Sequence, residues 1–193
     1  MVNGTGELHI QNGAQSRLVV LAQEEIHRHL TIRSVGDRLI IEPERGSQLR
    51  PSAALRYLLT TDDISLIDVG CAVDVTTQEY RTESLRIDTS GSTDLDMDVR
   101  AGSVTIAASG SFDGRLSGET TYLTLDFSGS ADLDAYDLTA QHVDVDTSGS
   151  ADIYVTAIES LDVSARGSSD VTYRGNPRVD HSSAGASSVT PAD

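Results

Sequence analysis

Hydrophobic and polar residues alternate with a period of two through most of the chain after residue 83. Around Gly129, for example, Leu123, Leu125 and Phe127 are separated by polar residues, and Leu133 and Ala135 follow the glycine. Such alternation is typical of a strand with one buried face. Each unit therefore predicts two short strands joined at a corner. Among the side chains predicted to point inward are Leu95, Leu125, Val145, Ile153 and Val163.

The corner is a repeated motif, Ser-Gly-Ser-x-Asp in its full form and degenerate in its last two copies. Its glycines are Gly91, Gly110, Gly129, Gly149, Gly167 and Gly185, spaced 19, 19, 20, 18 and 18 residues apart. A unit of this size cannot bury its own apolar face, so the units must stack. We expect a parallel β-helix of about five or six coils. An antiparallel sandwich would not require identical corners at equal spacing, and no six-residue repeat of the left-handed type is visible.

The first 75 residues do not follow the repeat. Strand-like runs lie at residues 7–10, 17–21, 30–33 and 38–42, and residues 43–51 have a loop composition. We expect a small strand meander and, before residue 76, the first coil. The meander would cover a strand edge that otherwise invites aggregation. The chain is thus predicted to be one domain, residues 1–193, with the meander and first coil in 1–75 and the repeat β-helix in 76–193.

Composition narrows the possible functions. The net charge of −16 argues against nucleic acid and anionic membrane surfaces as partners, because both are polyanions. No apolar run is long enough for membrane insertion. All 14 cationic residues are arginines, which excludes a lysine base or Schiff base. The single cysteine, Cys71, lies in an apolar run and is predicted to be a small buried residue.

An aspartate stands three residues after each of the first five glycines. If the units stack, these carboxylates form one row at roughly the 4.7–4.9 Å strand spacing, and Asp96 and Asp134 share a second row. Two explanations for the first row remain open. Each carboxylate could accept backbone N–H bonds from its own corner, or the row could bind calcium. The candidate ligand- or cation-binding residues are Asp94, Asp113, Asp132, Asp152 and Asp170.

A metal site near the N-terminus is also conceivable, because Glu24, His27 and His29 lie close in sequence. They fall in a segment that could form one helical turn. Residues two apart do not share a helical face, however, so the pattern argues against a shared metal ion.

A polysaccharide-active enzyme is the main alternative to a binding module. Hydrolases need carboxylates about 5–9.5 Å apart, which neighbouring coils could supply. Lyases would need a strong base, and near the aspartates only Arg86, Arg100 and Arg115 are available. We predict no catalytic residue, because the aspartates obey the repeat whereas a catalytic site breaks it. The main irregularity, residues 114–119, is expected to be a loop.

Several stretches together resemble one bacterial family. They are residues 6–10, residues 36–41, the Ser-Gly-Ser-x-Asp corners, and residues 170–177 followed by Ser183-Ala184-Gly185. This pattern is similar to the head-GIN domain family, also called auto-transporter adhesins. The family uses fuller Gly-Ser-Gly corners where this chain has Ser-Gly-Ser.

The resemblance implies an all-β protein with a right-handed β-helical body, exported to the periplasm or cell surface, and it implies no catalytic residues. The sequence start, Met1-Val2 before a Gly-rich run, has no export signal and is expected to be cut from a longer precursor. The partner would be a glycan or a protein at the cell surface. We expect a monomer or small homo-oligomer, and a self-assembling bactofilin-like scaffold is the alternative.

Overall fold

The computed structural model describes residues 1–44 and 55–192, so most of the loop predicted at residues 43–51 lies outside the described residues. The one helix among them is the single turn α1 (Glu24–His27). Everything else that is regular is β-structure, which confirms the all-β class. The strands are β1 (Val2–Asn12), β2 (Arg17–Leu21), β3 (Leu30–Val35), β4 (Arg38–Pro43), β5 (Arg56–Thr61), β6 (Leu66–Arg174), β7 (Arg178–Gly185) and β8 (Ser188–Pro191).

The N-terminal strands form a sheet in the order β2-β5-β1-β4-β3. The strand positions agree with the prediction, but the meander was wrong. β1 lies in the middle and pairs in parallel with β4, β5 and β6, whereas β2–β5 and β3–β4 are antiparallel. The reason is that β1 joins the repeat directly: Gly4 pairs with Cys71, and Glu7 pairs with Asp74.

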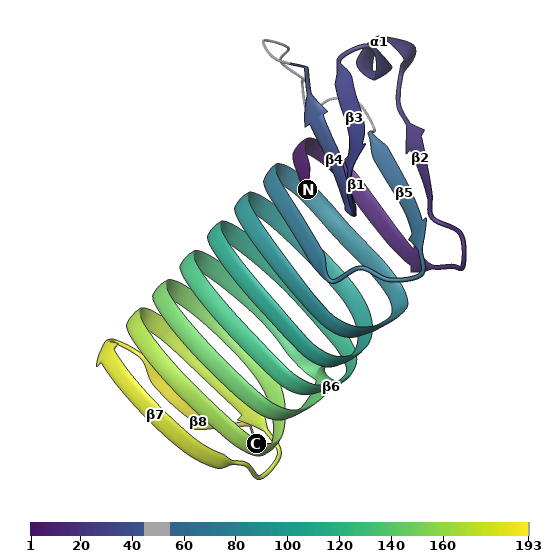
Figure 1. Ribbon diagram of the computed structural model, residues 1–193. Helices are drawn as coiled ribbons and strands as arrows, with labels where there is room; N and C mark the ends of the chain where they lie inside the picture. Colours follow the sequence, from purple (N-terminus) through teal and green to yellow (C-terminus); the bar gives the residue numbers. More distant parts are fainter. Residues whose placement is uncertain (45–54, 193) are drawn as a thin grey trace.

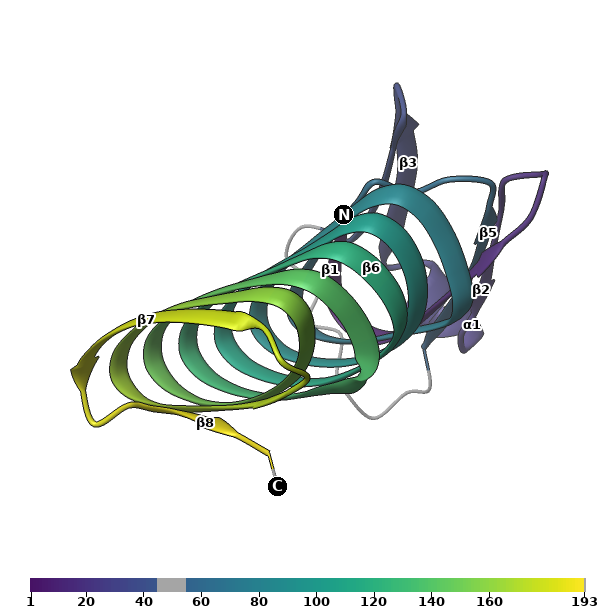
Figure 2. The same cartoon turned by 90° about the horizontal axis from the view of Figure 1, so that it is seen from below.

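β6 is one long curled strand of 109 residues. Figure 1 shows its ribbon winding through successive turns that lie side by side, with the N-terminal sheet at one end. β7 and β8 continue the stack in parallel at the other end, where Leu161 pairs with Val179 and Asp170 pairs with Ser188. Seen from below, the turns surround one common interior (Figure 2).

That interior is filled by the apolar positions of the repeat. Leu125, Val145 and Ile153 are fully buried, and Leu95 and Val163 are 3% and 4% exposed, which confirms the predicted inward set. Burial alternates with a period of two along β6, so the intervening side chains face solvent. In the final turn the row of Val145 and Val163 continues with His181, which pairs with Val163 and is exposed.

The corner glycines stack directly over one another. A β-carbon on Gly129 would lie 2.3 Å from the carbonyl oxygen of Gly110, and one on Gly149 would lie 2.1 Å from that of Gly129. Real β-carbons do not approach an oxygen so closely. Gly129 also has a φ of +135°, which side chains rarely adopt. Where these glycines stack, the corner therefore has no room for a side chain.

Cys71 occupies the corner position one turn before Gly91, the first glycine of the repeat. A β-carbon on Gly91 would lie 2.2 Å from the Cys71 carbonyl oxygen. The cysteine is exposed and has a φ of +73°. The prediction of a buried cysteine was therefore wrong, because Cys71 belongs to the corner and not to the apolar face that flanks it.

The predicted loop at residues 114–119 was also wrong, since β6 continues through it. Gly114 stands at the inward position that Leu95 and Leu133 hold in neighbouring units. The adjacent inward residue is Phe112, whose ring stacks on Phe127 at 5.2 Å between centroids. A β-carbon on Gly114 would lie 2.6 Å from the Phe112 ring. The Phe112 ring thus fills the space that a side chain at position 114 would occupy, and the turn keeps its shape.

The register can be tested by exchanging an inward and an outward residue. Leu125→Asp should lower the free energy of unfolding by about 3–5 kcal/mol, because it buries an unpaired charge. Asp96→Asn, on the exposed face, should change it by less than about 0.5 kcal/mol. Urea unfolding followed by circular dichroism measures both, and equal losses would contradict the register.

The glycine stack predicts a second contrast between neighbouring residues. Gly129→Ala should destabilise the protein by roughly 1–3 kcal/mol through backbone strain alone, and by more if the two turns are forced apart. Ser130→Ala, one residue along and exposed, should be close to neutral. Thermal melts of the two variants check this, and a Gly129→Ala melt that matches the parent protein would show that the turns are not in contact here.

Candidate functional site

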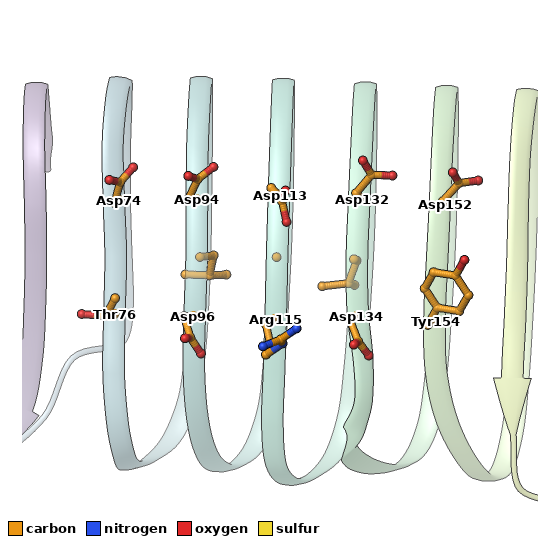
Figure 3. Close-up of a pocket in the computed structure, with 13 residues that line it drawn as sticks. Asp74, Thr76, Asp94, Asp96, Asp113, Arg115, Asp132, Asp134, Asp152 and Tyr154 are labelled. Atoms are coloured by element: carbon orange, nitrogen blue, oxygen red, sulfur yellow. The ribbon is translucent and has the colours of Figure 1, made fainter. Parts of the chain in front are cut away.

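Five aspartates line up on one outer face of β6: Asp74, Asp94, Asp113, Asp132 and Asp152 (Figure 3). We call them the carboxylate row. All five are exposed and each comes from a different turn. The structure thus brings together four of the five predicted residues. The fifth, Asp170, stands at the next equivalent position, where its carboxylate accepts a hydrogen bond from the Ser188 hydroxyl at 2.5 Å.

Asp74 is a member of the row that the sequence analysis missed. It stands three residues after Cys71, just as Asp94 stands three residues after Gly91, so the spacing would have revealed it once Cys71 was placed at a corner. Glu7 pairs with Asp74 and extends the row onto β1. The Arg56 guanidinium closes that end with an ion pair to Glu7 at 2.7 Å.

Between these ends the acids have few partners. Within the described part of the chain, the carboxylates of Asp94, Asp113, Asp132 and Asp152 take part in no hydrogen bond or ion pair. The expected bonds from each corner's own backbone N–H groups are therefore not formed. The carboxylate row presents open acceptor oxygens to solvent.

A second row runs beside the first, two residues further along each turn. It contains Thr76, Asp96, Arg115, Asp134 and Tyr154 (Figure 3). Asp96 and Asp134 share this row as predicted, with Arg115 between them. Arg86 and Arg100 are used elsewhere, in ion pairs with Asp88 and Glu119. Arg115 has no ion pair among those found in residues 1–44 and 55–192.

Together the two rows line a shallow, open cleft of about 480 Å³. Leu95, Gly114 and Leu133, which stand between the two rows in the sequence, line it as well. Carboxylates, one guanidinium and the half-exposed Tyr154 ring surround it. The site can therefore offer hydrogen-bond acceptors, one cation and an aromatic ring to a partner that lies along the stack.

Burial and like-charged neighbours raise the pKa of two aspartates. Burial and then the neighbouring Asp94 and Glu7 raise the pKa of Asp74 above its ordinary value of 3.8. On another face, burial and then Asp162 and Asp146 raise the pKa of Asp144. The aligned turns thus bring like charges near enough to disfavour ionisation.

No cluster in the described residues gathers three or more His, Cys, Asp or Glu side chains around one point where a metal ion could sit. The carboxylate row is extended rather than convergent. Near the N-terminus, Glu24 pairs with Arg28 at 2.9 Å and His29 lies 3.6 Å from Glu44, so these residues do not converge either. His142 stacks on Tyr122 and contacts the Ser160 hydroxyl at 3.0 Å.

The fold and the carboxylate row together define an all-β repeat protein with a long acidic surface. The chain belongs to the family described as "Putative auto-transporter adhesin, head GIN domain", whose model matches residues 1–177. The resemblance drawn from the corner motifs is therefore confirmed. No curated protein sequence matches the chain.

Solved structures with the same fold include proteins from Bacteroides and Parabacteroides species. A "putative adhesin" from Bacteroides fragilis superposes with a TM-score of 0.90 at 20% identity, over 98% of this chain and 90% of that one. A "putative lipid binding protein" from Parabacteroides distasonis gives 0.75 at 17% identity, over 100% and 91%. A "putative adhesin" from Parabacteroides merdae gives 0.64 at 12%, over 100% and 90%. No helix in the described residues is long and apolar enough to span a membrane.

The raised pKa of Asp74 predicts a pH-dependent effect. A raised carboxyl pKa means that the folded state holds the proton more tightly than the unfolded state, so stability falls as pH rises above 3.8 through that pKa. Asp74→Asn should therefore raise the free energy of unfolding at neutral pH, by less than about 1 kcal/mol for this exposed site, and thermal melts would show the gain as a higher melting temperature. The gain should vanish below pH 3.8. Asp88→Asn, which removes an acid paired with Arg86, should give no such gain.

Proposed function

We propose that this protein is a non-catalytic binding module of the bacterial cell surface or periplasm, an adhesin or scaffold. In this proposal residues 1–193 form one domain, built as a right-handed parallel β-helix of about five or six coils with the N-terminal sheet at one end. The carboxylate row and the row beside it are the binding face, so the ligand-binding residues are Asp94, Asp113, Asp132 and Asp152, extended by Asp74 and Asp170.

One observation carries the proposal: a series of exposed carboxylates without partners, one per turn, beside an exposed tyrosine and an arginine. Strand spacing places successive acids roughly 4.7–4.9 Å apart. An open, straight array of acceptors suits an extended partner with repeated hydroxyl or cationic groups. A cell-surface glycan has that form, and a protein strand with basic residues is the other partner class.

The equivalence of the acids supports a non-catalytic role. Hydrolysis of a glycosidic bond by general acid and base catalysis uses two carboxyl groups with different roles, which their environments set apart. Asp94, Asp113 and Asp132 are all exposed, lack partners and stand at the same place in their units. Nothing distinguishes one of them as a proton donor and another as a base. The names given to the two adhesin relatives agree with a binding role at the cell surface.

Arg115 favours one alternative function. It is a cation in a row otherwise occupied by acidic, hydroxyl and aromatic side chains, and it breaks the repeat in the cleft itself. A polysaccharide lyase uses a base of this kind beside carboxylates. In that alternative, Arg115 would abstract the proton and the flanking Asp96 and Asp134 would hold the sugar.

A glycan array combined with a polysaccharide turnover assay separates the two functions. We expect saturable binding without release of reducing ends or unsaturated products. Asp94→Asn with Asp132→Asn should weaken binding at least about tenfold, because two charged hydrogen-bonding groups are lost from the centre of the face. The matched control is Asp144→Asn with Asp162→Asn, which removes two acids from another face and should leave binding intact.

Turnover that is lost in Arg115→Gln while the fold is retained would replace this proposal with the lyase. Running the array with calcium and with a chelator shows whether the ion bridges the carboxylate row to an acidic glycan. Light scattering at physiological salt checks the assembly state, for which we expect a monomer or small homo-oligomer. Long polymers would instead support a bactofilin-like scaffold.

A further inference from the structure

A second and larger cleft lies between the N-terminal sheet and the start of the stacked turns of β6. Its volume is about 710 Å³, within the usual range of small-molecule sites. One wall is the inner face of the sheet, and the other is the segment of residues 61–68 that leads into β6. Figure 1 shows this sheet at the end of the wound strand.

The floor of the cleft is apolar and continuous with the core. It includes Val2, Leu8, Ile10, Leu18, Leu59 and Ile67. Along β6 the corresponding inward side chains pack against those of the next turn and are almost completely buried. Leu18, Leu59 and Ile64 are only partly buried, because nothing in the described chain covers them on the cleft side. Protein interiors are otherwise close-packed, and an apolar hollow of this size gains stability when it is filled.

The mouth of the cleft carries charges of both signs. Arg17 and Arg38 line it, and neither has an ion pair among those found in residues 1–44 and 55–192. Asp37, Asp63 and Asp68 line it as well. Asp63 accepts a hydrogen bond from the Thr82 hydroxyl at 2.7 Å, and Asp68 lies near enough to the Met1 ammonium group to oppose the lowering of its pKa by burial. Asp37 makes no hydrogen bond or ion pair with the described residues. An apolar floor with both cations and anions at its rim complements a hydrocarbon chain that ends in a zwitterion.

We propose that this cleft binds a single-chain phospholipid with a zwitterionic head group. The acyl chain lies on the floor between the sheet and residues 61–68. The phosphate faces Arg17 and Arg38, and the ammonium group faces Asp37 and Asp68. A purely anionic chain would meet the three aspartates, and a neutral alcohol would leave the charged rim without partners. The site is independent of the carboxylate row and of the partner proposed for it.

The test is displacement of a fluorescently labelled lysophosphatidylethanolamine from the intact protein by unlabelled palmitoyl-lysophosphatidylethanolamine, below its micelle concentration. We expect saturable displacement at one site per chain. The lauroyl analogue should bind much more weakly, by about fourfold for each buried methylene that is lost. Palmitic acid and palmityl alcohol should each displace the probe at least about tenfold less well than the zwitterion.

Two matched variants on β5 test whether the lipid binds in this cleft. Leu59→Trp fills the cleft and should abolish displacement, whereas Leu58→Trp, on the opposite face of the same strand, should leave it unchanged. If Leu59→Trp fails to fold by circular dichroism, Leu18→Trp fills the same cleft from β2. Arg38→Gln should weaken binding of the zwitterion at least about fivefold and leave palmityl alcohol unaffected.

Three outcomes would overturn the proposal: no saturable displacement, equal effects of Leu58→Trp and Leu59→Trp, or palmitic acid binding as tightly as the zwitterion. None of them bears on the glycan experiment, so the two proposals stand or fall separately.

Discussion

The close approach of consecutive backbones at the glycine corner is the constraint on which the rest of the structure depends. Each corner carbonyl lies where the next unit's β-carbon would be, as for Gly110 beneath Gly129. Glycine is needed at this point for its missing side chain and, in most units, for its positive φ. Because every turn must start from this contact, the residues that follow are placed in the same register, inward and outward alike.

The acidic face is a direct result of that register. Side chains three residues past each corner must align, although like charges at such spacing repel by roughly 1 kcal/mol in water. The structure limits this cost by leaving the acids exposed, where salt screens them. It also ends the line with Arg56 beside Glu7 and with Ser188 beside Asp170. At Asp74, burial and then the neighbouring acids raise the pKa of the carboxyl group.

Much of the wound part follows from the sequence because its signals are local: Leu125 and Val145 alternate with polar residues, and the glycines recur. The sequence-based prediction fails where a position of the repeat holds a residue of another type. Cys71 stands for glycine and so hid Asp74, and Phe112 compensates for Gly114 through a contact that spacing alone does not reveal. The pairing of Glu7 with Asp74 joins segments far apart in sequence. The N-terminal cleft likewise depends on how the sheet meets the first turn, for which no periodic signal exists.

The glycine contact also makes the unit interchangeable. Since each corner meets only the corner before and after it, a whole unit could be duplicated or deleted without disturbing the others, provided its glycine is kept. Every duplication would add one carboxylate to the outer face. Length and valency would then change together, and for a repeating partner each added contact acts through effective concentration and not merely by addition. Recombination that adds or removes whole units could thus change the avidity of the protein without creating a new binding site.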